Sequence, residues 1–188
     1  MLNNKAGQKL IPIYLVVGPP AVGKSTTSRS LAAHFPRSIH IPVDDLREMV
    51  ISGLVLPGQD WSAELALQVC LARHSAVHSA LEYHKAGFAV VIDDFWDGEH
   101  ISDYAGLLDH PDFHKVVLLP KQEVAHNRNF TRSGGDPSRE YIDQGIEIVY
   151  ARLRGQADQL KQDGWLVIDS SHMDVSAIVE LILDHTSS

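Results

Sequence analysis

The sequence predicts an α/β fold in which a parallel β-sheet carries helices on both faces. Two observations support this prediction: short apolar runs alternate along the chain with segments of helical periodicity, and a glycine-rich turn separates the first apolar run from the first helix. Strands that alternate with helices are joined by right-handed crossovers, which make the strands parallel and cover both faces. Ligands of such sheets bind at the carboxyl ends of the strands.

Five short apolar segments flanked by turn or polar residues are expected to be strands. They are residues 10–17, 38–43, 88–92, 115–119 and 165–168. Helices are expected at 24–35, 44–51, 61–85, 99–108, 122–131, 138–161 and 175–183, with Asp60 or Ser62 capping the third. No repeat, linker or low-complexity tract divides the chain, so residues 1–188 are expected to form a single domain. The loops 52–60 and 133–137 are then flaps on that domain.

The composition is that of an ordinary globular protein and disfavours several other classes. The chain has 188 residues, of which 44% are hydrophobic and 21% are charged. Its formal net charge of -8 and the absence of a Lys/Arg run disfavour nucleic acid as a partner. Residues 1–8 do not resemble a signal peptide, and no apolar run approaches the roughly 20 residues that span a bilayer. The sequence therefore predicts a cytoplasmic protein without a membrane segment, and it leaves the oligomeric state open.

The strongest chemical signal is the turn after the first predicted strand, residues 18–25 (GPPAVGKS). It matches G-x-x-x-x-G-K-[ST] between a strand and a helix, the context in which this pattern binds a nucleotide. Gly18 and Gly23 let backbone N–H groups converge on phosphate oxygens, and the following helix adds the positive end of its dipole. Lys24 then supplies a charge for the outer phosphates of ATP, and Ser25 supplies a hydroxyl for Mg²⁺. The other residues of the predicted nucleotide site are Pro19, Pro20, Ala21, Val22 and Thr26.

A chance match is the alternative interpretation of this turn. A glycine turn with an incidental lysine would produce the pattern in roughly one chain of this length per 150. The flanking strand and helix make that coincidence rarer still.

The second signal is the acidic pair at the end of the third predicted strand. Apolar residues 90–92 run into Asp93 and Asp94, which would lie beside the glycine-rich turn. Asp93 is expected to hold Mg²⁺ directly or through water, and Asp94 is expected to face the substrate. The alternative is that the pair only caps the segment that follows.

The third signal directly follows the second predicted strand. A phosphoryl transferase needs a carboxylate that orients the acceptor hydroxyl and takes its proton, and Asp44 is placed to do so. Asp45 is expected to contact the substrate. Arg47 lies one helical turn beyond Asp44 on the same helix face and is expected to bind the substrate or a phosphate. The alternative is that one or both acids simply cap the short helix.

The fourth signal is a pair of arginines before the loop 133–137. Arg128 and Arg132 are i,i+4 neighbours on a predicted helix and are expected to clamp the transferring phosphoryl group. A solvated basic helix face is the alternative. Trp61 and Trp96 flank the predicted pocket, where each can stack on a substrate or belong to the core.

Taken together, these motifs resemble those of the small P-loop kinases and phosphotransferases, a group that includes chloramphenicol phosphotransferase, the zeta-toxin kinases, gluconate kinase and the kinase domain of polynucleotide kinase. The resemblance spans nearly the whole chain. It rests on GPPAVGKS at 18–25, D-x-x-R at 44–47, VVIDD at 90–94, KVVLLP at 115–120 with RNFTR at 128–132, and LVIDSS at 166–171.

The resemblance implies a three-layer fold with five parallel strands in the order 2-3-1-4-5. It also implies a small lid that carries Arg128 and Arg132 over ATP, and an acceptor base at Asp44. Asp45 departs from the family pattern because it places a second acidic residue directly after Asp44. The choice of base between Asp44 and Asp45 therefore stays open. The substrate region, residues 52–61 and 96–100, matches no single member of the group.

The expected function is therefore an ATP-dependent kinase. It would move the γ-phosphoryl group of ATP-Mg²⁺ to a hydroxyl of a small molecule of the antibiotic, sugar or nucleotide-sugar type. Two alternatives remain at this point: an ATP-binding switch or toxin-like module that acts on a protein partner, and a 5′-hydroxyl nucleic-acid kinase, which the acidic composition disfavours.

Overall fold

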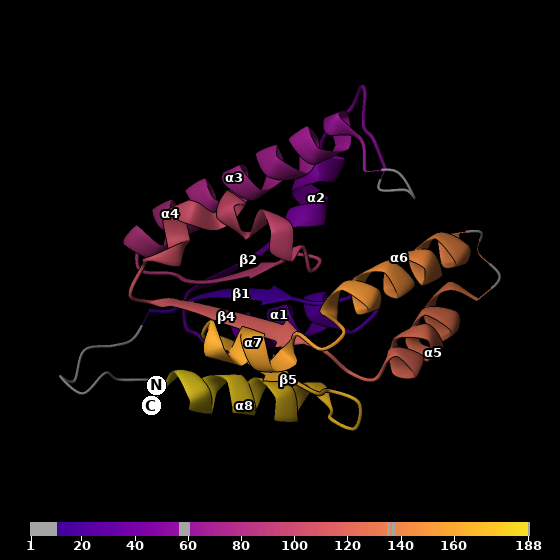
Figure 1. Cartoon of the computed structure of the whole chain (residues 1–188). Coiled ribbons are helices and arrows are strands. Elements are labelled where there is room, and N and C mark those ends of the chain that lie inside the picture. The colour runs from indigo at the N-terminus through magenta and orange to yellow at the C-terminus, as the bar shows by residue number, and fades with distance from the viewer. Residues whose placement is uncertain (1–10, 57–60, 135, 137, 188) are drawn as a thin grey trace.

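The computed structural model describes residues 11–56, 61–134, 136 and 138–187. Its centre is a five-stranded parallel sheet with the strand order β2-β3-β1-β4-β5, which confirms the predicted fold class and order (Figure 1). The strands are β1 (Ile13–Val17), β2 (Ser38–Pro42), β3 (Ala89–Asp93), β4 (Phe113–Leu118) and β5 (Trp165–Ile168).

The middle strand, β1, is buried along its whole length. It pairs with β3 on one side, where Ile13 aligns with Val90, and with β4 on the other, where Ile13 aligns with Phe113. Helices cover both faces of the sheet, so every residue of β1 meets either a strand or a helix. This explains why its sequence is a continuous apolar run rather than an alternating one.

The helices form two layers around the sheet (Figure 1). On one face lie α2 (Val43–Glu48), α3 (Ala63–Lys85), the 3-10 helix η1 (Gly98–Tyr104) and α4 (Ala105–Leu108); on the other lie α1 (Lys24–Ala32) and α8 (Val175–Thr186). Side chains of β1 alternate between the two cores, with Leu15 facing the α3 side and Tyr14 the α1–α8 side. Two further helices, α5 (Gln122–Ser133) and α6 (Ser138–Leu153), project beyond the carboxyl ends of the strands, and α7 (Ala157–Gln162) returns the chain to β5.

Two helix predictions need correction. The helix expected over 138–161 is interrupted between α6 and α7, where Gly155 has φ of +76° and so ends the helical path. The helix expected over 99–108 is divided between η1 and α4, and backbone angles at His100 depart from helical values. Of the two proposed caps of α3, Ser62 is confirmed, since its Oγ accepts a hydrogen bond from Leu65 N at 3.1 Å.

The alternative cap, Asp60, and parts of both predicted flaps lie outside the described residues. Within the part of the chain that the structure describes, no helix combines the length and the apolar character required to cross a membrane.

Candidate active site at the carboxyl edge of the sheet

The turn 18–25 forms a closed loop at the carboxyl end of β1. Gly18 has φ of +152°, and a Cβ on it would lie 2.3 Å from the carbonyl oxygen of Leu118 in β4. Gly23 has φ of +98° and immediately precedes α1, whose first backbone hydrogen bond runs from Thr27 N to Gly23 O. The N–H groups of residues 24–26 therefore have no acceptor within the helix and are available to an anion.

Lys24 folds back over this loop. Its Nζ donates a hydrogen bond to Pro19 O at 2.9 Å. Burial lowers the pKa of the Lys24 ammonium, while the nearby carboxylates of Asp44, Asp93 and Asp94 act in the opposite direction. The side chain is thus a partly desolvated cation at the mouth of the loop, where a triphosphate would lie.

The side chains predicted to hold Mg²⁺ are in contact. Ser25 Oγ donates to Asp93 Oδ1 at 3.2 Å, and Asp93 is almost fully buried at the end of β3. The other carboxylate oxygen, Oδ2, contacts Nε2 of His40, which comes from the neighbouring strand β2. A hydroxyl and a carboxylate are oxygen donors of the kind that Mg²⁺ prefers, so these residues fit the ion. Sequence reasoning missed His40, although a polar residue inside the apolar strand β2 was an available signal.

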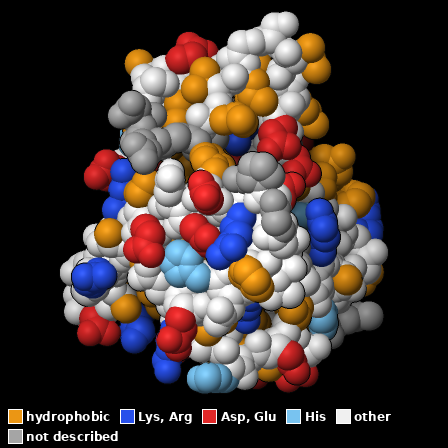
Figure 2. Space-filling model, turned by 90° about the vertical axis from the view of Figure 1, so that its right-hand side faces the viewer, with side chains coloured by type: hydrophobic (Ala, Val, Ile, Leu, Met, Phe, Trp, Pro, Cys, Tyr) orange, Lys and Arg blue, Asp and Glu red, His pale blue; other side chains and the backbone are white. Residues whose placement is uncertain are grey.

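A cavity of about 560 Å³ opens over these groups. Figure 2 views this edge of the molecule and shows charged side chains of both signs in its middle, with hydrophobic side chains gathered above them. The cavity wall includes the predicted site residues Pro20, Ala21, Gly23, Lys24, Ser25, Thr26, Asp44, Arg47, Asp93, Trp96 and Arg132. These residues come from four separate segments of the sequence, 20–26, 44–47, 93–96 and 132, which meet around one space.

Two predicted substrate contacts lie elsewhere. Asp45 is exposed on α2 and is not part of the cavity wall, whereas its neighbour Asp44 is. Asp94 is also absent from the wall because its carboxylate is buried beneath it: Oδ2 accepts hydrogen bonds from Arg73 Nε at 2.7 Å and from Tyr104 OH at 2.9 Å. The expectation that Asp94 faces the substrate is thus corrected.

Arg73 is the centre of a buried charge cluster. Besides Asp94, its guanidinium contacts Asp97 and Asp103, each through Nη1 at 3.1 Å. Burial raises the pKa of Asp94, and Arg73 opposes this by stabilising the carboxylate. The cluster anchors residues 94–97 to α3, and Trp96 N in the same segment donates to Gly18 O at 3.1 Å.

The predicted arginine pair is divided between two positions. Arg132 is exposed on α5 and lies in the cavity wall. Arg128 is turned away, because its Nη1 donates to Val22 O at 2.8 Å and its Nη2 to Ser170 O at 3.3 Å. It therefore ties the loop 18–25 to the segment after β5, and the expectation that both arginines clamp the phosphoryl group is corrected.

Arg47 borders the cavity from α2 and is 5% exposed. Its Nη1 donates to Val55 O at 3.0 Å, and its Nη2 lies 3.6 Å from Asp44 Oδ1. Within the described residues, no acceptor lies within hydrogen-bonding distance of its buried Nε.

Most of the wall that sequence reasoning missed comes from α6. Its contributors include Tyr141, Gly145, Ile148, Val149 and Arg152, which share one helix face by their spacing. A Cβ on Gly145 would lie 3.3 Å from Pro20 Cγ, which shows how closely α6 approaches the loop. The periodicity of this face was visible in the sequence, but a face that covers a core has the same periodicity.

Aromatic side chains form another part of the wall. The rings of Trp61 and Phe95 are 6.0 Å apart, and His100 stacks on Trp61 at 6.1 Å. Trp61 is exposed and Trp96 is buried, and both belong to the cavity wall. Both tryptophans that flank the predicted pocket therefore border it.

Comparison with known proteins supports the same fold. No protein-family model and no curated protein sequence matches the chain. Among solved structures, a gluconokinase from Sinorhizobium meliloti 1021 is 15% identical over 96% of this chain and 94% of its own, with a TM-score of 0.61. The tunicamycin resistance protein of Deinococcus radiodurans is 18% identical over 93% and 94%, with a TM-score of 0.62. Shikimate kinase from Acinetobacter baumannii is 16% identical over 93% and 92%, with a TM-score of 0.61. The chain therefore shares the fold of these structures, as its motifs predicted.

Proposed function

We propose that this protein is an ATP-dependent kinase that phosphorylates a hydroxyl group of a small molecule. The observation that carries the proposal is the convergence of Lys24, Ser25, Asp93 and Asp44 on one cavity at the phosphate-binding loop. Structures of the same fold named as gluconokinase and shikimate kinase support this reaction class.

The nucleotide would be held by the loop and its lysine. Free N–H groups at the start of α1 and the Lys24 ammonium bind the phosphates, and Lys24 then leaves Pro19 O for the outer phosphate oxygens. Ser25 and Asp93 would hold Mg²⁺, which when bound neutralises charge on the phosphates. His40 is placed to orient the Asp93 carboxylate for that role.

Transfer requires a base for the acceptor. The acceptor oxygen bonds to the γ-phosphorus, the bond from that phosphorus to the β–γ bridging oxygen breaks, and ADP leaves. Asp44 takes the hydroxyl proton, since it borders the cavity with Lys24 and Asp93 and its side chain is 57% exposed. Arg132 lies where it can neutralise charge on the transferring group from the α5 side.

The acceptor would lie between Arg47, the aromatic wall and α6. The Arg47 guanidinium supplies positive charge beside the acceptor oxygens, and Phe95 and Trp96 cover the apolar parts of the acceptor. The direct test is a panel of sugars, sugar acids, nucleosides and hydroxylated antibiotics incubated with γ-labelled ATP and Mg²⁺. Transfer of label to a compound supports the proposal, and bound ATP that labels no hydroxyl compound contradicts it.

Replacing Asp44 by asparagine tests the assigned base. We expect kcat to fall about 10²- to 10⁴-fold, because general-base catalysis contributes that much, while the Kd for ATP stays near the wild-type value. Asp45→Asn is the matched control, since Asp45 is the adjacent acid on the same helix but lies outside the cavity. Steady-state kinetics on the best acceptor, with ATP binding measured by calorimetry, gives both quantities. A reversed pattern, with Asp45→Asn inactive and Asp44→Asn active, would show that the base is misassigned.

A further inference from the structure

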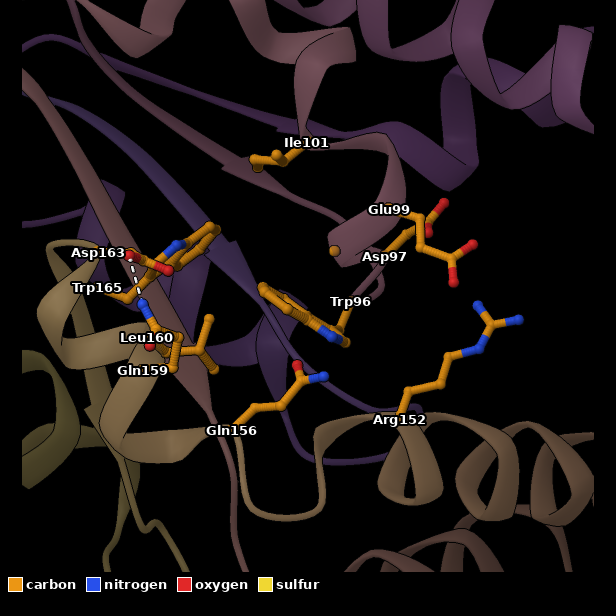
Figure 3. Close-up of a pocket in the computed structure, with 11 residues that line it drawn as sticks. Trp96, Asp97, Glu99, Ile101, Arg152, Gln156, Gln159, Leu160, Asp163 and Trp165 are labelled. Carbon is orange, nitrogen blue, oxygen red and sulfur yellow. Dashed lines mark hydrogen bonds between the residues drawn. The ribbon is translucent and has the colours of Figure 1, made fainter.

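The cavity of about 560 Å³ over the loop 18–25 is called the nucleotide cavity below. A second cavity, of about 490 Å³, adjoins it (Figure 3). It lies between η1 and α7, and its base is Trp165 at the start of β5. Its wall includes Trp96 and Arg152, which also belong to the wall of the nucleotide cavity. The two spaces are therefore neighbours that share one aromatic and one cationic side chain.

Trp96 is held firmly at the boundary. Its backbone N–H is bonded to Gly18 O, and its ring meets the Trp165 ring edge-to-face at 5.3 Å. A Cβ on Gly98 would lie only 2.8 Å from the Trp96 ring, so glycine is required there for the ring to lie as it does. The position of the Trp96 side chain between the two cavities is thus fixed relative to the phosphate-binding loop.

The second cavity has aromatic and aliphatic surfaces beside unengaged polar groups. Trp96, Trp165, Leu160 and Ile101 provide the apolar surface. Figure 3 shows Glu99 and Arg152 extending toward one another at one end, and Gln156 beside Trp96. Within the described residues, the side chains of these last three polar residues make no hydrogen bond or ion pair, so their bonding capacity is free for a ligand.

We infer that the acceptor site continues past Trp96 into this second cavity, which takes a sugar ring or similar polyhydroxylated ring at the distal end of the acceptor. This inference rests on the proposed kinase function. A ring of this kind has C–H faces that pack on tryptophan, and its hydroxyls bond to amide, carboxylate and guanidinium groups. The volume lies within the range of about 300–1,000 Å³ that is typical of small-molecule sites.

The three tryptophans of the chain report on the two cavities separately. Trp61 borders only the nucleotide cavity, Trp165 only the second cavity, and Trp96 both. In ¹H–¹⁵N spectra each indole gives one signal, which Trp61→Phe and Trp165→Phe assign by its loss.

The probes are methyl glycosides of hexoses and N-acetylhexosamines, added with Mg²⁺ and a non-hydrolysable ATP analogue. We expect saturable shifts of the Trp165 and Trp96 signals. An unchanged Trp165 signal with every glycoside overturns the inference.

A blocking variant gives a second, kinetic test. Gln156→Trp fills the cavity from an exposed position whose side chain makes no bond in the described structure, so folding should survive. The assay compares kcat/KM for two acceptors that the enzyme phosphorylates, one with two rings and the other its single-ring fragment. We expect the variant to reduce the wild-type preference for the two-ring acceptor at least 10-fold, mainly by raising the KM of that acceptor. Gln162→Trp is the matched control, because Gln162 is exposed at the end of α7 outside the cavity, and it should keep the preference. An unchanged preference in Gln156→Trp contradicts the inference.

The outcomes separate this inference from the proposed function. If a hydroxyl compound is phosphorylated but no glycoside shifts the Trp165 signal, the extended acceptor site is contradicted and the kinase function is not. A Trp165 shift without any phosphorylated product contradicts the kinase function and leaves the second cavity as a sugar-binding site.

Discussion

Lys24→Met is expected to lower kcat/KM for phosphoryl transfer by about 10³-fold or more, a loss of roughly 4 kcal/mol of transition-state stabilisation. The ammonium is the only cation in the loop 18–25, and it lies beside the carboxylates of Asp44 and Asp93. Without it, the charge that develops on the outer phosphate oxygens has no cationic partner within the loop. Methionine keeps much of the side-chain length, so the variant removes charge more than volume.

The measurement is steady-state transfer of labelled phosphate, with ATP affinity from calorimetry and folding from the thermal midpoint. Lys85→Met is the control, because Lys85 is an exposed cation at the end of α3 and is absent from both cavity walls. Near-wild-type transfer by Lys24→Met would show that the loop does not act on a triphosphate in the proposed way.

Arg73→Met is expected to destabilise the folded protein by about 3–5 kcal/mol, the usual cost of removing one partner from a buried ion pair. Arg73 is 1% exposed, as is Asp94, and Asp97 is 6% exposed. The variant leaves these carboxylates buried without their cation. For a chain of this size, the expected drop in thermal midpoint is roughly 6–20 °C.

The dependence of this loss on pH identifies its cause. Without Arg73, the folded-state pKa of Asp94 rises further above its value in the unfolded chain, so only the ionised form is penalised by folding. The deficit relative to wild type should therefore be largest at neutral pH and shrink as the pH falls toward about 3.9, the ordinary pKa of aspartate. Arg29→Met, at an exposed position on α1, should show neither effect. A deficit that is constant with pH would indicate lost packing rather than unpaired charge.

Much of the fold could be predicted because each signal was local. Five apolar runs gave the strands, and the loop 18–25 fixed the relation between β1 and α1. The break between α6 and α7 could not be predicted with the same certainty, because a single Gly155 is tolerated in many helices and acts here only through its left-handed backbone. The division of the segment 99–108 likewise depends on contacts of η1 with α3, which are tertiary.

The candidate site was predictable where a reactive or metal-binding side chain lies just beyond the carboxyl end of a strand. Ser25, Asp44 and Asp93 all lie at the carboxyl edge, and topology alone brings them together. Side-chain direction was not predictable in the same way. The sequence placed Asp93 and Asp94 together at the end of β3 but did not show that Asp94 turns beneath the cavity. That direction depends on Arg73, a cation 21 positions earlier in α3. Arg128 and Arg132 share a helix face, but only Arg128 donates its guanidinium hydrogen bonds to carbonyl oxygens of the described residues.

The central place of β1 in the sheet affects how the chain folds during synthesis. Its neighbours β3 and β4 begin at Ala89 and Phe113, so β1 leaves the ribosome long before either partner exists. At about 5–20 residues per second, translation needs roughly 4–15 s to travel from Ile13 to Ala89. During that interval the most apolar strand of the nascent protein is unpaired and adheres readily to other chains. Aggregation therefore competes with folding over this interval, until β3 and β4 are available to pair with β1.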